Sequence, residues 1–434
     1  MVPQRAGLHE GAPMSESDLR LTRAERDAAF ARVEAFNMPN RVQVFRQAGT
    51  SLMIGRREAY RFWDVDGCEF YDFHLNGGTY NLGHRHPELV DIMRRALDVY
   101  DIGNHHLASD LRGRLAERLV ASAGPEMELC LFAPGGGEAN DIAIKSVRRA
   151  TGKRRIISLA GGFHGRTGLS GAVGDPTNAR IFLSDHPDEL SVVPFDDVDA
   201  IERELLHGDV AGVIVEVIPA TLGFPMPSPQ YLKHVRALCD EHDVLLIADE
   251  VQTGLLRSGT LWSVAGYEVQ PDVLVTGKGL GGGLYPVAAV VLNGRAGDWI
   301  RTDGWGYVST SGGAELGACV ALGVLDILER PETISAMQQV SAAFQTELQA
   351  LAARYPLLEE VRQRGVIIGL KTTHPNGGRL LNRAAYERGL WAYAASFDTS
   401  VLQFKPGLLF PLADIPDVVG RLTSAIEAVQ EIAS

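Results

Sequence analysis

The sequence predicts an α/β fold in which a mixed but mostly parallel sheet is flanked by helices. From about residue 76 to 325, short apolar runs alternate with segments of helical periodicity, as in strand–helix–strand units around a parallel sheet. Beyond residue 325, amphipathic helices flank short strands, which indicates a smaller α+β domain. We therefore expect an N-terminal arm and part of the small domain over 1–75, a large domain over 76–325, and the rest of the small domain over 326–434.

Individual elements can be predicted from the N-terminus to the C-terminus. Residues up to about 40 are charged and Ala-rich, which indicates an arm or helices that lie on another surface. Residues 60–73 read as a hairpin with Asp-Gly at its turn. The apolar runs that predict the strands of the large sheet are 127–132, 155–159, 212–215, 244–248, 273–276 and 287–292. Near the C-terminus we expect helices over 334–353 and 415–432, and strands near 365–371 and 400–404.

Composition excludes several classes of protein. The 434 residues carry 41 basic and 54 acidic side chains, a net charge of −13, and no basic run, which argues against nucleic acid as a partner. No apolar run is long enough to span a bilayer, and the first thirty residues lack an export-type apolar stretch, so we expect no membrane. The four cysteines are far apart and form no CxxC pair, which fits a reducing cytoplasm better than a disulfide framework or a zinc site.

Ligands of open α/β sheets bind outside the carboxyl ends of the strands, so the residues after each apolar run are candidates for ligand contacts. The run 127–132 leads to a Gly-rich segment, 134–138, that enters a helix expected to stop near Gly152. Gly136 and Gly137 would let backbone N–H groups approach a phosphate at the helix N-terminus. Taken alone, such a segment is more often a turn that only connects strand to helix.

Two further strand ends carry candidate ligand contacts. After 155–159, Phe163 is placed to cover a flat ring and Arg166 to meet an anionic substrate group, although an aromatic next to glycines is more often ordinary packing. Glu216 ends the run 212–215, where a structural ion pair and a ligand contact are both open.

The next two strand ends decide the interpretation. The run 244–248 ends in Asp249, and 273–276 ends in Gly277-Lys278-Gly279, so a buried acid and a buried lysine emerge side by side. Pyridoxal phosphate (PLP) needs this pair: the lysine forms a Schiff base with its aldehyde, and the carboxylate keeps its ring nitrogen protonated. Burial beside a cationic ring would lower the pKa of Lys278 and leave more of it neutral. A structural Asp–Lys ion pair is the alternative for these two residues alone.

Other ligand classes match less well. The spacing Gly277-x-Gly279-x-x-Gly282 resembles a dinucleotide fingerprint, so a nicotinamide-dependent oxidoreductase is an alternative from a different class. The following segment, 284–292, reads as another strand and not as the helix that should carry a pyrophosphate. His84, His86, His105 and His106 lack cysteine or carboxylate at ligand spacing, so we expect loop or capping histidines and no metal.

An ordered set of motifs resembles one family over nearly the whole chain. It consists of DVDG (64–67), NLGHRHP (81–87), GEAN (137–140), FHGRT (163–167), LLIADEVQTG (245–254), TGKGLGGG (276–283) and TSGG (310–313). With these motifs the sequence resembles the class III (omega) aminotransferases, which have the fold type I of PLP-dependent transferases. The resemblance implies a large PLP-binding domain with a small domain from both termini, and a homodimer whose sites are completed across the interface.

The resemblance also implies roles at the matching positions. Lys278 would be the catalytic lysine and proton shuttle, and Asp249 would hold the ring nitrogen. Phe163 would stack on the ring, Gln252 would touch its hydroxyl side, and Thr310 would reach the phosphate of the partner subunit. The remaining expected contacts to the cofactor are Gly136, Gly137, Glu216 and Val251, and those to the substrate are Arg166, Ser309 and Gln403.

Departures from the family pattern concern the substrate. Gln403 stands where many relatives have an arginine that resembles a carboxylate clamp, which points to an amine or an unusual amino substrate. Lys405 is a possible substitute, as a point charge and not a bidentate fork. We predict an aminotransferase that moves an amino group from a primary amine or amino acid to a carbonyl acceptor. Aminomutases or racemases, decarboxylases and phospho-lyases of the same scaffold are the alternatives, because the motif residues do not separate them.

Overall fold

The computed structural model describes residues 21–433, and these form two compact units. One unit contains the described residues up to Arg57 together with Arg61–Phe70, and the other contains Glu58–Tyr60 and the residues from Tyr71 onward. The expected domain limits at 76 and 325 remain a prediction. Within 21–433, no helix is long and apolar enough to cross a membrane.

The smaller unit holds two short helices and the expected hairpin. Gly67 has a left-handed φ of +88° at the hairpin turn, and its N–H donates to the Asp64 carbonyl at 3.0 Å. The rings of Phe62 and Phe70 stack at 5.3 Å between centroids. The prediction of a hairpin with Asp-Gly at its turn is therefore confirmed, whereas residues 1–20 of the expected arm lie outside the described residues. The elements here are η2 (Arg23–Glu25), α1 (Arg26–Phe36), α2 (Pro39–Gln47), β1 (Ile54–Glu58), β2 (Arg61–Asp64) and β3 (Glu69–Asp72).

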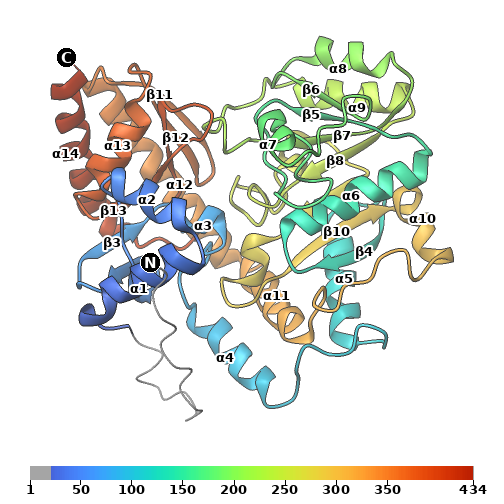
Figure 1. The fold of residues 1–434 in the computed structure, drawn as a ribbon, viewed down its shortest axis with the longest axis horizontal. Helices are drawn as coiled ribbons and strands as arrows, with labels where there is room; N and C mark the ends of the chain where they lie inside the picture. The colour runs from blue at the N-terminus through green and yellow to red at the C-terminus, as the bar shows by residue number, and fades with distance from the viewer. Residues whose placement is uncertain (1–20, 434) are drawn as a thin grey trace. The chain divides into compact units, whose positions relative to one another are not determined.

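The larger unit is built on a seven-stranded sheet with the strand order β4-β10-β9-β8-β7-β5-β6 (Figure 1). β10 is antiparallel to both of its neighbours and the other pairs are parallel, so the prediction of a mixed, mostly parallel sheet is confirmed. All six expected strands are present, and β6 is an edge strand that the sequence pattern did not indicate. The bounds are β4 (Met127–Ala133), β5 (Arg155–Leu159), β6 (Leu190–Val193), β7 (Val210–Glu216), β8 (Leu245–Asp249), β9 (Val273–Thr276) and β10 (Ala288–Asn293).

Helices cover both faces of this sheet. Along β8, Leu245 and Ile247 pack in one buried cluster with α6 and α10, while Leu246 and Ala248 pack in the other with α5, α8, α9 and α11. This alternation follows from the two-residue period of a strand. The bounds of the helical segments are α3 (Leu75–Gly78), α4 (Pro87–Leu97), α5 (Asp110–Ser122), α6 (Gly136–Thr151), α7 (Pro176–Ile181), α8 (Val198–Leu205), α9 (Tyr231–Glu241), η3 (Val264–Tyr267), η4 (Lys278–Gly281), α10 (Gly294–Thr302) and α11 (Glu315–Leu328).

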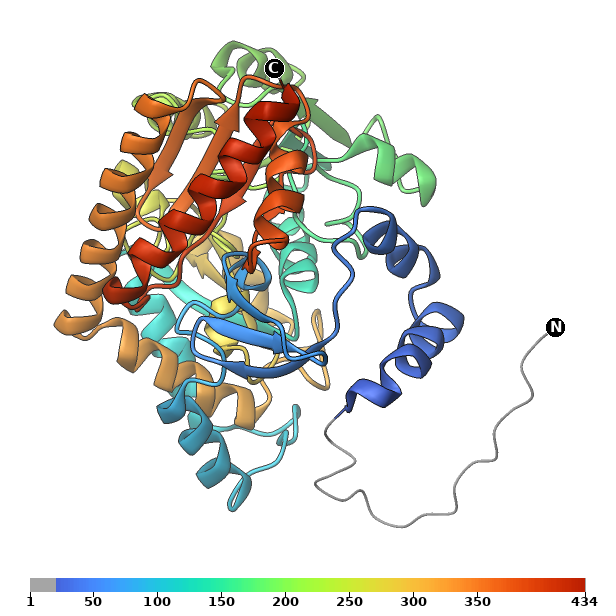
Figure 2. The same ribbon diagram turned by 90° about the vertical axis from the view of Figure 1, so that its left-hand side faces the viewer.

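The C-terminal part contains a second, antiparallel sheet of order β11-β12-β15-β14. In Figure 2 the helices α12, α13 and α14, coloured orange to red, lie side by side over this sheet. Phe73 stacks on Phe404 at 4.0 Å between centroids, so the end of β15 lies beside the chain that follows β3. The bounds are α12 (Pro331–Arg354), β11 (Leu358–Arg364), β12 (Ile367–Thr372), α13 (Gly377–Tyr386), β13 (Leu390–Trp391), β14 (Tyr393–Ala394), β15 (Val401–Phe404), η5 (Leu412–Asp414) and α14 (Ile415–Ala433).

The parallel strands place their carboxyl ends at one edge of the large sheet. Glu216 at the end of β7 is the register partner of Asp249 at the end of β8, and Asp249 is the partner of Val275 near the end of β9. Side chains that follow these strands therefore meet at this edge, as expected for a ligand site of an open α/β sheet.

Candidate active site

Asp249 is a buried carboxylate held by three donors. One oxygen accepts a hydrogen bond from Asn140 Nδ2 at 2.8 Å and is paired with His164 Nδ1 at 2.8 Å, while the other accepts from the Val251 N–H at 3.0 Å. Burial alone raises the pKa of Asp249, but the hydrogen bond and charge of His164, with the charge of Lys278, bring it below its usual value. The carboxylate is therefore ionised at neutral pH.

Lys278 lies two residues after the end of β9, and its side chain is partly buried. Its backbone has a left-handed φ of +47° within the short 3₁₀ turn η4, a conformation that costs a non-glycine residue energy and is common at functional sites. Burial lowers the pKa of its amine, and the charges of Asp249 and Glu216 only partly oppose this shift. A larger fraction of the amine is thus neutral and nucleophilic than in a solvated lysine.

A glycine that the sequence reasoning missed packs directly on this lysine. Gly77 has a φ of +69°, and a Cβ built on it would lie 3.0 Å from Lys278 Cε and 3.5 Å from Gln252 Oε1. Asn76 before it is also left-handed, with a φ of +48°. The Asn-Gly-Gly run at 76–78 was the available signal, since such runs mark left-handed backbone.

The glycines before α6 form an open, donor-rich cradle. A Cβ on Gly136 would lie 3.0 Å from Val251 Cγ1, and one on Gly137 would lie 3.1 Å from Thr167 Oγ1, so both glycines allow a close approach. Among the described residues, no side chain caps the N-terminus of α6, which leaves backbone N–H groups and the positive end of the helix dipole for an anion.

Tyr307 joins this cradle to the loop that carries two expected contacts. Its hydroxyl donates to the Phe132 carbonyl at 2.9 Å and lies 2.7 Å from Glu138 Oε1, at the start of α6. In the same loop, Ser309 Oγ accepts from the Gly312 N–H at 3.1 Å, and Thr310 is exposed. The loop is therefore fixed to the cradle at Tyr307 and presents Thr310 outward.

The segment after β5 lies against the end of β7. The Phe163 N–H donates to Glu216 Oε1 at 2.8 Å, and the Phe163 ring is 40% exposed. Burial raises the pKa of Glu216 to about 7, so this carboxyl is partly protonated at neutral pH. Arg166 lies over the Phe163 ring at 5.0 Å and pairs with Asp175 at 3.2 Å, so its guanidinium is already engaged.

A second lysine, Lys405, follows β15 and is buried. Lys405 Nζ donates to Gln403 Oε1 at 2.7 Å, and Gln403 Nε2 donates to the Ala220 carbonyl at 2.8 Å. Burial and the charges of Arg257 and Lys278 lower the pKa of Lys405 well below its usual value. The pKa of His74 is likewise lowered by burial and by the two lysines, so Lys405, His74 and Lys278 share one environment.

The described part of the chain does not gather the groups that a dinucleotide or a metal ion would need. β9 leads into the 3₁₀ turn η4 and then into β10, so the helix that should receive a dinucleotide pyrophosphate does not begin at Gly279. Within residues 21–433 no group of three or more metal-ligating side chains is gathered. His84 Nε2 is instead paired with Asp72 Oδ2 at 2.9 Å.

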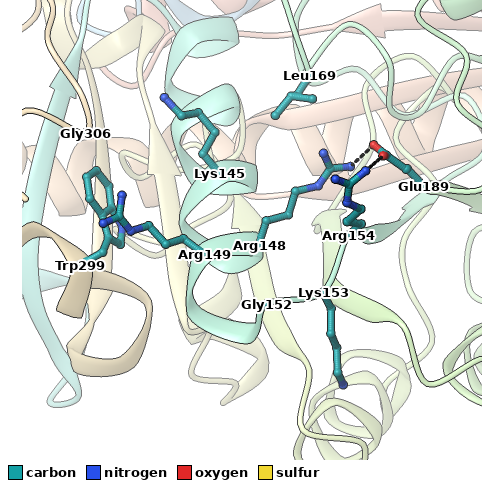
Figure 3. A pocket seen from close by; sticks show the side chains of 10 residues that line it. All are labelled: Lys145, Arg148, Arg149, Gly152, Lys153, Arg154, Leu169, Glu189, Trp299 and Gly306. Carbon is teal, nitrogen blue, oxygen red and sulfur yellow. Dashed lines mark hydrogen bonds and ion pairs between the residues drawn. The ribbon is translucent and has the colours of Figure 1, made fainter.

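A separate pocket of about 560 Å³ lies at the carboxyl end of α6 (Figure 3). Arg148 and Arg154 both point to Glu189, and Arg149 lies 5.2 Å over the ring of Trp299. Cations at the last turn of a helix are stabilised by its dipole, which accounts for this charge. The pocket is about 20 Å along the helix from Gly136, at 1.5 Å per residue, and is not part of the candidate active site.

The residues at the sheet edge fit PLP. The donor set combines an acid held ionised, a lysine with a lowered pKa, and a glycine cradle that a single Cβ would begin to fill. The fold and the site are thus those of a class of enzyme that uses PLP.

Comparisons with known proteins identify the family. The model of the family "Aminotransferase class-III" matches residues 44–426. An uncharacterized aminotransferase of Archaeoglobus fulgidus is 41% identical over 92% of this chain and 94% of its own. The acetylornithine/succinyldiaminopimelate aminotransferase of Yersinia pestis is 32% identical over 85% and 91%, respectively. The crystal structure of the ornithine aminotransferase of Toxoplasma gondii superposes with a TM-score of 0.81 at 26% identity, covering 95% of this chain and 100% of that one.

The chain therefore belongs to the class-III aminotransferase family. It is a PLP-dependent enzyme that transfers an amino group from an amine donor to a carbonyl acceptor, and it has the fold of PLP-dependent aminotransferases. The class, cofactor and reaction predicted from the sequence are thus confirmed.

Proposed function

We propose that Lys278 and Asp249 are the catalytic pair of this aminotransferase. The observation that carries the proposal is a buried lysine of lowered pKa beside a buried carboxylate that His164 and Asn140 hold ionised. When bound, PLP supplies an aldehyde that condenses with amines and a ring that accepts the electrons released at the substrate carbon. The protein's task is to bind and orient this group and to move protons.

Each catalytic side chain has a distinct part in that task. Asp249, ionised at neutral pH, keeps a proton on the ring nitrogen through a charge-assisted hydrogen bond. Lys278 would anchor the cofactor between turnovers, and its free amine would take a proton from the substrate carbon and deliver it to the carbon of the cofactor that accepts the amino group. Its lowered pKa keeps a neutral fraction available for this step.

The remaining predicted contacts orient the cofactor and substrate. We assign the phosphate to Gly136 and Gly137 at the N-terminus of α6, because their backbone is open to an anion. Phe163 covers one face of the ring, Val251 supports the cradle, and Gln252 lies near the Lys278 stem. We place Glu216 against the cofactor, and Arg166, Ser309 and Gln403 closest to the substrate.

The first experiment is the visible absorption spectrum of the purified protein with added PLP, mixed with amine and amino acid donors without an acceptor. We expect a visible band from the Lys278-bound cofactor, which a true donor bleaches. Lys278→Ala should lose the band and retain only non-covalent cofactor, whereas Lys145→Ala, at the surface pocket, should keep it. A band that persists in Lys278→Ala contradicts the assignment, and a band that no donor bleaches contradicts transamination.

We further propose that the enzyme works as a homodimer. Several large apolar side chains are exposed near the Thr310 loop, and His106 packs on Trp305 at 5.3 Å between ring centroids, so these segments are adjacent. They are Leu97, Val99, Ile102, Leu107, Trp305 and Val308, with exposed fractions between 41% and 73%. Several large apolar side chains exposed on neighbouring segments are typical of a protein interface. We propose that Thr310 reaches the phosphate bound by the partner.

A mixing experiment tests whether Thr310 acts across the interface. We expect Thr310→Ala to weaken PLP binding by roughly 10- to 100-fold, the cost of a hydrogen bond to a charged group. Mixed with Lys278→Ala under conditions of subunit exchange, it should regain activity, because one site of the hybrid then has both residues intact. If mixing restores no activity although hybrids form, Thr310 does not act in the partner's site.

Two further assignments, the cellular location and the domain limits, complete the proposal. We place the enzyme in the cytoplasm, which is supported by four free cysteines, Cys68, Cys130, Cys239 and Cys319. We also propose the large and small domains with limits near 76 and 325, supported by the change from the parallel sheet to the antiparallel sheet after α11.

A further inference from the structure

Within the described part of the chain, Lys405 is a buried amine without a carboxylate partner. Its side chain is 1% exposed, and its Nζ donates to the neutral amide oxygen of Gln403 at 2.7 Å. Gln403 and Lys405 are two residues apart on extended chain, so both side chains project to the same side. Among residues 21–433 no carboxylate oxygen lies within 4.0 Å of this amine.

The charges around Lys405 are mainly of its own sign. Arg257 and Lys278 both act on it as cations, and Asp72 is the one carboxylate of the described residues that opposes them appreciably. Asp72 is already occupied, because His84 Nε2 contacts one oxygen at 2.9 Å and the Leu75 N–H donates to the other at 2.7 Å. Beside the cofactor lysine there is thus an excess of buried positive charge.

Such a site is incomplete without an anion. Burial without a counter-charge disfavours the protonated form of an amine, which is why the pKa of Lys405 is lowered, and a ligand that supplies the counter-charge would restore its proton. An ammonium group has three donors, and Gln403 occupies one of them, which leaves two for a ligand. The ring of Phe224, 5.8 Å from Nζ, forms an apolar wall beside the amine.

We propose that Lys405 binds the carboxylate group of the amino donor and of the carbonyl acceptor that replaces it. The substrates are then amino acids and oxo acids, and simple amines are poor donors. Gln403 is the positioning residue, because it fixes the amine through Oε1 while Ala220 fixes its own amide. This inference rests on the proposed role of Lys278, since the same site must hold the cofactor.

The test compares donors that differ only in a carboxylate. The pairs are 4-aminobutyrate with propylamine and L-ornithine with 1,4-diaminobutane, and the readout is the rate of bleaching of the visible band against donor concentration. In the wild type we expect the carboxylate member of at least one pair to be preferred. Lys405→Met should reduce that preference by roughly 10- to 100-fold, the value of a charged hydrogen bond, and Lys405→Arg should restore part of it.

A matched control lies on the neighbouring strand. Lys371 on β12 pairs with Glu359 at 3.4 Å at the surface, so Lys371→Met removes the same charge from the same sheet and should leave the preference unchanged. The proposal is overturned if Lys405→Met lowers the rates with both members of a pair equally, or if the wild type prefers the amine throughout. If donors bleach the visible band of the wild type without any preference for a carboxylate, the role of Lys405 is wrong and that of Lys278 is unaffected. If the wild type forms no visible band, the proposed role of Lys278 is wrong as well.

Discussion

The two buried lysines of the site occupy opposite electrostatic environments. Lys278, at the end of β9 in the large sheet, has Asp249 and Glu216 as opposing charges, whereas Lys405, at the end of β15 in the small sheet, faces Arg257 and Lys278 itself. Burial lowers the pKa of both amines, but two carboxylates oppose the shift of Lys278, whereas two cations add to the shift of Lys405 and Asp72 alone opposes it. The difference indicates that the protein supplies the counter-charge where it needs a reactive amine and leaves it to the ligand where it needs recognition.

The largest expected effect comes from removing the carboxylate of Asp249, which is one of the two charges that oppose the lowered pKa of Lys278. In Asp249→Asn the ring nitrogen and the buried His164 lose their charged partner, and a hydrogen bond to a charged group is worth about 1.5–3 kcal/mol, roughly 10- to 100-fold in rate. We expect kcat for transamination to fall by that factor while the visible band persists, because the lysine is still present. Single-turnover kinetics measures the loss.

The control for this change is Asp141→Asn. Asp141 accepts from the Ser170 N–H at 2.6 Å and from Thr167 Oγ1 at 3.0 Å on the same helix α6 as the glycine cradle, but it does not contact Asp249. We expect a small change in its rate. An Asp249→Asn enzyme with unaltered kcat would show that the ring nitrogen does not depend on this carboxylate.

Substitutions of glycine test the space around Lys278 without changing any charge. Gly77 and Gly152 have the same φ of +69°, but a Cβ on Gly77 would meet Lys278 Cε at 3.0 Å, whereas one on Gly152 would meet none of the described residues within 4 Å. Both Gly→Ala variants should lose about 1–2 kcal/mol of unfolding free energy from left-handed strain. Only Gly77→Ala should also slow the attachment of PLP, as followed by the growth of the visible band.

An equal rate of PLP attachment in the two alanine variants would show that Gly77 serves only the backbone turn. A loss of unfolding free energy much larger in Gly77→Ala than in Gly152→Ala would indicate that the lysine stem cannot shift to admit the methyl group. Urea denaturation monitored by fluorescence gives the unfolding free energies for both variants.

The sequence predicted the parts of the site that are local to one strand end. Asp249, Lys278 and the glycines before α6 follow apolar runs, and parallel strands bring their carboxyl ends together. The sequence did not reveal that His164 pairs with Asp249 or that Lys405 is buried beside cations, because these are contacts between distant segments. A single chain carries no periodic signal for such contacts.

The missed elements have their own physical reasons. β6 is a four-residue edge strand, and β11 exposes the charged residues Glu359 and Glu360, so neither forms an apolar run. α13 begins with Gly377 and Gly378, which are poor helix formers, and tertiary packing against β15 overrides that preference. The predicted runs, by contrast, include the fully buried strands β7, β8, β9 and β10, where an unbroken apolar run is the expected pattern.

The weakest expected effect concerns the second carboxyl near Lys278. The pKa of Glu216 is raised by burial from 4.5 to about 7, so the folded state binds its proton more tightly than the unfolded state does. The stabilisation is fully present below pH 4.5 and is lost as the pH rises through about 7. Glu216→Gln keeps the size of the side chain and removes this titration. We therefore expect the Tm of the variant to rise relative to the wild type between about pH 5 and 8.

A second buried carboxyl, which the wild type and the variant share, is the reference for this measurement. Burial also raises the pKa of Glu250 to about 7, and this carboxyl is present in both proteins, so the difference in Tm isolates Glu216. In apoprotein without PLP, a difference that grows with pH supports a protonated Glu216 beside Lys278. A difference that stays constant from pH 5 to 8 would mean that Glu216 is ionised throughout, and Lys278 would then have two full negative charges beside it, in contrast to the cationic surroundings of Lys405.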